Sequence, residues 1–112
     1  MRQQYSPPRD GPETVEADPA RVFDVLEDAD CRAFLRALEE PSTAAELSRR
    51  CAVPSSTTYR KLDRLTDVGL VEAVHEICGR NNHQARYHRT VESVTFEFRG
   101  GLLTLDVDAG DE

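Results

Sequence analysis

The sequence lacks tryptophan, has one methionine and one lysine, and contains only three cysteines among its 112 residues. Cys31, Cys51 and Cys78 form no closely spaced pair, and their odd number argues against the disulfide framework of a small secreted protein. No stretch approaches the roughly 18 consecutive apolar residues that a membrane span requires. The polar, proline-containing N-terminus differs from a secretion signal, so we expect a cytoplasmic protein with no membrane partner.

Basic charge is also scarce, because the formal net charge is −7 at pH 7. The basic residues that are present gather in two segments. Residues 48–66 contain five basic side chains against Asp63 alone, and residues 80–91 contain three arginines and no acid. The acids are concentrated in residues 10–30 and 106–112. Since local charge decides which partner a surface attracts, the two basic segments can face a polyanion even in an acidic chain.

Helix signals follow a polar segment, residues 1–17, that we expect to be a flexible tail. Residues 18–19, an aspartate followed by proline, are typical of a helix start. A second helix is expected to begin at Asp28 or Asp30 and to run to about Glu39. The residues predicted to face inward from these two helices are Val22, Phe23, Leu26, Phe34, Leu35 and Leu38.

Two more helices are predicted in close succession. Thr43 and Glu46 match a capping box at the start of a short helix over about 44–51. After a tight connection, a longer helix is expected over about 55–68, and Gly69 ends it. The side chains that we expect to be buried from these two helices are Ala45, Leu47, Thr58, Leu62 and Leu65.

After the fourth helix the apolar pattern changes to the two-residue period of strands. Residues 70–78 and 84–90 are predicted to form a hairpin around a turn at 79–83. Apolar and polar residues then alternate in residues 94–99 and 103–107, on either side of two glycines, which predicts a second hairpin.

Two short helices joined by a tight turn, the second opening with small hydroxyl residues, are typical of a helix-turn-helix. We therefore predict an α+β fold, in which residues 18–91 form a winged helix-turn-helix domain of about four helices followed by a wing hairpin. Residues 92–107 form the additional C-terminal hairpin, and residues 108–112 an acidic tail. The apolar face of that hairpin exceeds what so small a domain covers, which suggests a dimerisation element in a symmetric homodimer.

The fourth helix is expected to bind double-stranded DNA in the major groove, in a protein that regulates transcription. Its first residues are small enough for close approach, and Arg60 can contact a guanine through two hydrogen bonds. Neighbouring basic residues suit phosphates, and Arg80 at the tip of the wing can enter the minor groove. The predicted DNA-binding residues are Thr43, Arg49, Arg50, Ser55, Ser56, Thr57, Tyr59, Arg60, Lys61, Arg64, Arg80, Asn81 and Asn82.

The stretch VPSSTTYRKLDRLTDVGLVE, residues 53–72, resembles the recognition helix and following strand of ArsR-type and TrmB-type prokaryotic regulators. In that group a proline, a serine-threonine pair, a Tyr-Arg pair, spaced leucines and a Gly-Leu-Val close recur. The resemblance extends over residues 22–72, and many acids with a single lysine resemble the composition of regulators from salt-loving archaea. The side chains that the resemblance places toward the major groove are Ser56, Thr57, Tyr59 and Arg60. The second hairpin is not the standard C-terminal element of ArsR-type proteins, so the way in which that family dimerises is not assigned to this chain.

The same features leave one alternative open, a winged-helix module that docks onto a basic partner protein of the transcription machinery.

His75, Cys78, His83 and His88 surround the first hairpin, but in a strand His75 and Cys78 face opposite sides, so no metal site is predicted. The sequence has no glycine-rich nucleotide loop, Ser-His-Asp set or paired-carboxylate pattern. We therefore predict no catalytic residues, no cofactor and no small-molecule effector.

Overall fold

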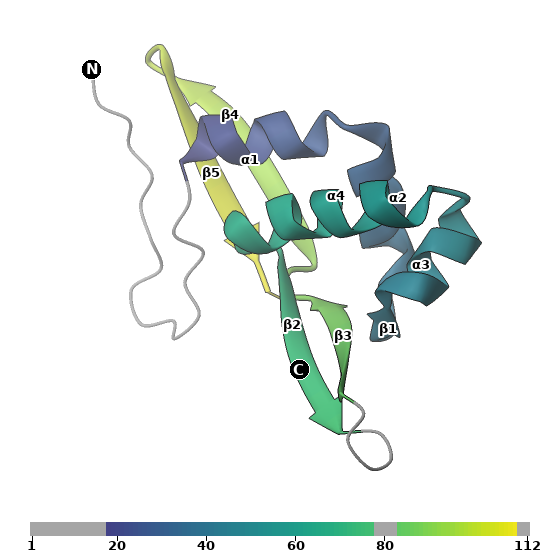
Figure 1. The fold of residues 1–112 in the computed structure, drawn as a ribbon. Helices are drawn as coiled ribbons and strands as arrows, with labels where there is room; N and C mark the ends of the chain where they lie inside the picture. The colour runs from purple at the N-terminus through teal and green to yellow at the C-terminus, as the bar shows by residue number, and fades with distance from the viewer. Residues whose placement is uncertain (1–17, 78–82, 110–112) are drawn as a thin grey trace.

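The computed structural model describes residues 18–77 and 83–109, and Figure 1 shows how their helices and strands are arranged. In this part of the chain four helices, with a two-residue strand between the second and third, precede four longer strands. The fold is a winged helix-turn-helix of the α+β class with an additional C-terminal hairpin, as predicted. The elements are α1 (Pro19–Leu26), α2 (Ala29–Ala37), β1 (Ser42–Thr43), α3 (Ala44–Cys51), α4 (Ser55–Asp67), β2 (Val71–Ile77), β3 (His83–Arg89), β4 (Ser93–Arg99) and β5 (Leu102–Asp108).

Aspartate side chains fix the starts of the first two helices. The carboxylate of Asp18 accepts the N–H of Ala20 at 3.2 Å, at the predicted start of α1. Of the two candidate caps for α2 the structure uses Asp28, whose carboxylate accepts the N–H groups of Asp30 at 2.9 Å and Cys31 at 3.4 Å. Each cap satisfies an amide that has no acceptor within the helix, which stabilises the helix by about 1 kcal/mol.

The wing belongs to a three-stranded antiparallel sheet in the order β1-β3-β2. Strands β2 and β3 pair along their full length. Strand β1, which was not predicted from the sequence, places Ser42 opposite Tyr87 and Thr43 opposite Arg86. Two residues show no periodicity, so only the fold reveals this strand. It attaches the start of α3 to the root of the wing.

The core lies between the helices and the root of the wing. The predicted stripe of α4 is confirmed, because Thr58, Leu62 and Leu65 have no exposed surface. Phe34 of α2 is equally buried, and Leu38, just beyond that helix, is 2% exposed. Other side chains with no exposed surface are Val22, Cys31, Leu47 and Leu70.

One inward-facing prediction in each of α1 and α3 is wrong. Ala45 is exposed and Ala44 is buried in its place, because Ala44 lies three residues before Leu47 and shares its side of the helix. Likewise Phe23 is 53% exposed, whereas Val25, which is three residues after Val22, is buried. In both helices the three-residue spacing decides which side chain faces the core.

The second hairpin, β4–β5, crosses α1, while the wing extends in another direction from the C-terminal end of α4 (Figure 1). Leu105 of β5 is 5% exposed and joins the core. The ring of Phe96 meets that of Phe23 edge-on, with 5.2 Å between ring centroids. Gly100 and Gly101 have φ values of 60° and 82°, the left-handed backbone that a tight two-residue hairpin turn requires and that glycine adopts without strain.

Candidate nucleic-acid interface

Helices α3 and α4 form the helix-turn-helix, and a capping box fixes its beginning. The Glu46 N–H donates to the hydroxyl of Thr43 at 3.1 Å, and the Thr43 N–H donates to the Glu46 carboxylate at 2.9 Å. The predicted capping box is therefore confirmed. The hydrogen bond from the Thr43 N–H also holds the pKa of Glu46 below its ordinary value.

The turn between the two helices is fixed by hydroxyl groups. Helix α3 ends at Cys51, and its C-cap residue Ala52 adopts the left-handed conformation at φ 57°. The next carbonyl, that of Val53, accepts hydrogen bonds from the hydroxyls of Ser48 at 2.6 Å and Thr58 at 3.3 Å. Since Ser48 belongs to α3 and Thr58 to α4, these bonds connect both helices to the turn and determine how α4 is presented.

The start of α4 differs from the other helix starts that the structure describes. Helices α1, α2 and α3 each have a side-chain cap, whereas α4 follows Pro54 and has none. The first helical residues, Ser55 and Ser56, are short and exposed. Uncapped amides at the positive end of a helix dipole bind anions, and phosphates in particular.

Further exposed side chains continue from this helix start. Arg60 is exposed, Tyr59 is 53% exposed, and Thr57 is partly exposed. At the end of α3, on the other side of the turn, Arg49 and Arg50 are exposed as well. None of the three arginines forms an ion pair with residues 18–77 or 83–109. We refer to these side chains as the outer face, which comprises Arg49, Arg50, Ser55, Ser56, Thr57, Tyr59 and Arg60.

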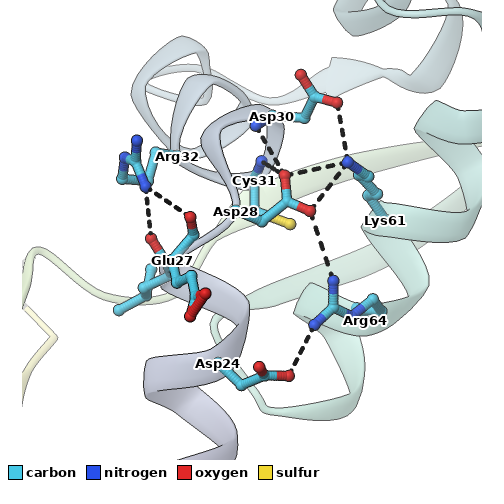
Figure 2. A network of polar contacts seen from close by, with 9 residues as sticks. Asp24, Glu27, Asp28, Asp30, Cys31, Arg32, Lys61 and Arg64 are labelled. Carbon is cyan, nitrogen blue, oxygen red and sulfur yellow. Dashed lines mark hydrogen bonds and ion pairs between the residues drawn. The ribbon is translucent and has the colours of Figure 1, made fainter.

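Lys61 and Arg64, three residues apart on α4, face the connection between α1 and α2 (Figure 2). The ammonium group of Lys61 lies 2.9 Å from carboxylate oxygens of both Asp28 and Asp30. The guanidinium of Arg64 lies 3.1 Å from Asp24 and 3.5 Å from Asp28. The structure thus places both side chains against the molecule's own acids, although from the sequence both were expected at phosphates.

This ion-pair network keeps its members charged. Hydrogen bonds to Asp28 and Asp30 raise the pKa of Lys61 above its ordinary value. Burial acts to raise the pKa of Asp28, but the hydrogen bonds from Lys61 and from the N–H groups of Asp30 and Cys31 outweigh burial, and the pKa is lowered. The Lys61 side chain is only 15% exposed, so we leave it out of the interface proposed below. Arg64, at 36% exposed and paired twice, is left out for the same reason.

Thr43 also has a different environment from the one expected of a DNA contact. It is 7% exposed, its hydroxyl accepts the Glu46 N–H, and its backbone belongs to β1. A side chain used in this way caps α3 and cannot reach a ligand without leaving the cap.

The three wing residues expected at DNA, Arg80, Asn81 and Asn82, lie outside the described residues. The root of the wing is described, and there Tyr87 of β3 is 8% exposed. Burial raises the pKa of Tyr87, as do the nearby Tyr59 and Asp63 of α4, so the root of the wing lies close to the exposed side of α4.

Two arginines of the second basic segment have partners within the molecule. The guanidinium of Arg86 lies 3.4 Å from Glu76 and 3.9 Å from Glu46. Arg89 donates to the carbonyl of Leu35 at 2.7 Å. The positive charge available to a partner is therefore smaller than the sequence count suggested. Glu76 and Arg86 are near-neighbours across the predicted hairpin, which is a signal that could have revealed this pair.

Neither metal-like clusters nor long apolar helices occur in the described ranges. No three His, Cys, Asp or Glu side chains in residues 18–77 and 83–109 lie together as metal ligands do. Cys78, one of the residues weighed for a metal site, lies outside these ranges. No helix among the residues described has both the length and the apolar character needed to cross a membrane.

With this geometry in view, the chain can be compared with known protein families. Residues 26–74 match the family model described as a helix-turn-helix domain. The match runs from the end of α1 into β2 and includes α2, α3 and α4. It supports a DNA-binding regulator of the helix-turn-helix kind, with DNA as its partner, and points away from an enzyme. No curated protein matches the chain. Strands β3, β4 and β5 lie beyond the helix-turn-helix match.

Proposed function

We propose that this chain is a sequence-specific regulator of transcription that binds double-stranded DNA, with α4 in the major groove and the wing near the minor groove. The observation that carries the proposal is the outer face, which combines an uncapped helix start with exposed arginines that form no ion pair within the described chain. The resemblance to ArsR-type and TrmB-type regulators supports it, as does the helix-turn-helix match. We further propose a cytoplasmic protein from a salt-loving archaeon, with no small-molecule effector.

Each part of the outer face has a chemical role in this proposal. The free amides at Ser55 and Ser56 bind a phosphate at the helix start. Arg60, one turn further along, forms two hydrogen bonds to a guanine, while Tyr59 contacts a neighbouring base edge. Arg49 and Arg50, the next cations along the chain before α4, contact backbone phosphates. Phosphate contacts fix the position of α4, and Arg60 provides sequence preference.

The proposal assigns residues 18–91 to DNA binding and the hairpin at 92–107 to association of two copies. A symmetric homodimer presents two α4 helices to half-sites one helical turn apart. The wing residues Arg80, Asn81 and Asn82 stay in the proposal as contacts at or beside the minor groove.

A selection experiment followed by affinity measurement tests the proposal. A library of random-sequence duplexes is enriched on the wild-type protein, and binding of the selected duplex is measured by fluorescence anisotropy. Replacing Arg60 by alanine should weaken binding about 10-fold to 100-fold and relax the sequence preference, as expected for loss of a guanine contact. The matched control is Arg21→Ala, because Arg21 is an exposed arginine beside the C-terminal half of α4, and its loss should leave affinity unchanged.

Salt dependence provides a second readout. If Arg49, Arg50, Arg60 and Arg80 are the cations that each copy brings to the duplex, and Lys61 and Arg64 stay with their own acids, log K should fall with log salt at a slope no steeper than about −4 per copy. A much steeper slope would contradict this division of the basic residues. Equal, weak binding of every duplex by the wild type and Arg60→Ala would instead favour the docking-module alternative.

A further inference from the structure

Two basic side chains of α4 are held by acids from the segment that contains α1 and the start of α2. Arg64 lies 3.1 Å from Asp24 and 3.5 Å from Asp28 (Figure 2). Lys61 lies 2.9 Å from both Asp28 and Asp30. Three carboxylates therefore surround two cations, and this side of α4 carries no surplus of positive charge. We refer to Asp24, Asp28, Asp30, Lys61 and Arg64 as the acidic clamp.

Arg64 is the member of the acidic clamp that lies nearest to the outer face along α4. It follows Arg60 by four residues, about one helical turn, so the two side chains leave the helix on the same side. The Arg64 side chain is 36% exposed although it is paired with two carboxylates. An unpaired arginine at this position would extend the row of cations that begins with Arg60.

The carboxylate of Asp28 is fixed in place and anchors the clamp. Its Oδ1 accepts the N–H groups of Asp30 at 2.9 Å and Cys31 at 3.4 Å, which caps α2. Its Oδ2 faces Lys61 at 2.9 Å and Arg64 at 3.5 Å. The carboxylate cannot follow Arg64 toward a ligand without leaving the cap. To reach a phosphate, Arg64 must therefore give up its pair with Asp28.

We infer, on the basis of the proposed function, that Asp24 and Asp28 limit the sequence-independent affinity of this chain for DNA by keeping Arg64 from phosphates. A phosphate contact strengthens binding to every sequence, because it carries no sequence information. Each such contact adds about −0.9 to the slope of log K against log salt. A contact that contributes nothing at about 1 M salt therefore contributes about 8-fold at about 0.1 M. With Arg64 held back, more of the affinity depends on the base contact of Arg60.

A variant that neutralises both acids tests the inference. Asp24→Asn/Asp28→Asn frees Arg64 and keeps the cap of α2, since asparagine caps a helix as well as aspartate does. Binding to a scrambled version of the selected duplex is measured by fluorescence anisotropy at several potassium chloride concentrations. The variant should bind this duplex about 8-fold more tightly than the wild type at about 0.1 M salt, with a slope steeper by about 0.9. Its preferred sequence in the selection should be unchanged.

A matched control separates the release of Arg64 from the loss of negative charge. Glu27→Gln/Asp67→Asn removes the same charge from two exposed carboxylates that form no ion pair within residues 18–77 and 83–109. Glu27 directly precedes Asp28, and Asp67 lines the same hollow as Arg64. Because no cation is released, the control should bind the scrambled duplex with nearly the wild-type affinity and slope.

Arg64→Gln completes a double-mutant cycle. In the variant that lacks both acids, it should restore the wild-type affinity and slope for the scrambled duplex. In the wild type, where Arg64 is already paired, it should leave the slope unchanged. A gain in the control equal to that of Asp24→Asn/Asp28→Asn, or a gain that survives Arg64→Gln, would mean that the acids act by general repulsion and would overturn the inference.

Folding is checked by circular dichroism for each variant. If the double variant is not folded, Asp24→Asn alone takes its place, because the Asp24 side chain is 70% exposed and its loss disturbs the fold least. It should show a smaller gain in the same direction, and no gain overturns the inference. Failure of Arg60→Ala to weaken binding contradicts the proposed function and, with it, the inference. If Arg60→Ala weakens binding but neutralising the acids leaves the scrambled duplex bound as by the wild type, only the inference fails.

Discussion

Asp28 has two roles that its substitutions can separate. Its carboxylate caps α2 through the N–H groups of Asp30 and Cys31, and it also forms ion pairs with Lys61 and Arg64. Asparagine caps a helix as well as aspartate does but carries no charge, whereas alanine provides neither function. We therefore expect Asp28→Ala to destabilise the protein more than Asp28→Asn.

The size of each effect follows from the environment of Asp28. Loss of the cap costs about 1 kcal/mol. The side chains of Asp28 and Lys61 are 18% and 15% exposed, so their pair lies between exposed pairs, worth about 0.2–1 kcal/mol, and fully buried pairs, whose breakage costs about 3–5 kcal/mol. Because Lys61 keeps Asp30 as a partner, we expect a loss of about 1–1.5 kcal/mol for Asp28→Asn and about 2–2.5 kcal/mol for Asp28→Ala.

Urea denaturation at pH 7 and constant potassium chloride measures these differences, with linear extrapolation of the free energy of unfolding. Asp67→Asn, which removes an exposed carboxylate from the last residue of α4, is the control and should change stability by less than about 0.5 kcal/mol. Equal losses for the two Asp28 variants would refute the capping role. Wild-type stability of Asp28→Asn would refute the contribution of the ion pairs.

Acid pH should reduce the difference between wild type and Asp28→Asn. The pKa of Asp28 is lower in the folded protein than its ordinary value of about 3.9, so its ionised form stabilises the fold above that pH. This contribution is lost as pH falls from about 4 through the lowered pKa. Denaturation measured between pH 7 and pH 3 should show the wild type approaching the variant at the acid end, and a constant difference would contradict the assignment.

Two substitutions and one labelling experiment test other parts of the structure. Ala52→Gly should stabilise the protein by about 0.5–1 kcal/mol, as measured by urea denaturation, because glycine adopts φ 57° without strain at a modest entropic cost. A loss of stability would contradict the strain assigned to Ala52. Gly101→Ala should destabilise the protein by about 1 kcal/mol in the same assay. The cause is the backbone angle φ 82° alone, since an added Cβ would meet no atom within 4 Å. An unchanged denaturation midpoint would contradict the left-handed conformation of this turn residue. Burial raises the pKa of the Cys31 thiol to about 11, so about one Cys31 thiol in a thousand is ionised at pH 8. Iodoacetamide should therefore label the partly exposed Cys51 before the buried Cys31. Equal labelling of the two cysteines in peptide mass spectrometry would contradict the burial of Cys31.

Elements with local signals could be predicted from the sequence. The cap at Asp18 and the box formed by Thr43 and Glu46 involve residues within three positions of one another, so the sequence contains all the information that places them. The glycines at 100 and 101 locate the second turn in the same way, and the alternation on either side of them predicts β4 and β5.

Contacts between distant segments could not be predicted in this way. Lys61 meets Asp28 and Asp30 from positions 33 and 31 residues away, so its chain neighbours do not show that it is already paired. In the sequence Lys61 and Arg60 are adjacent cations, yet adjacent positions on a helix point about 100° apart, and only the packing of α4 against α2 decides which of them remains free.

Strand β1 affects how the protein would recognise the shape of a DNA duplex. Because Thr43 both caps α3 and pairs with Arg86 in the middle of β3, the wing and the helix-turn-helix are connected directly through this residue. The separation between the wing and the start of α4 is therefore largely preset in the free protein. If both elements contact one duplex, sites whose minor groove already has the matching width will bind with the least deformation, and the protein will discriminate among sequences at base pairs that it never touches.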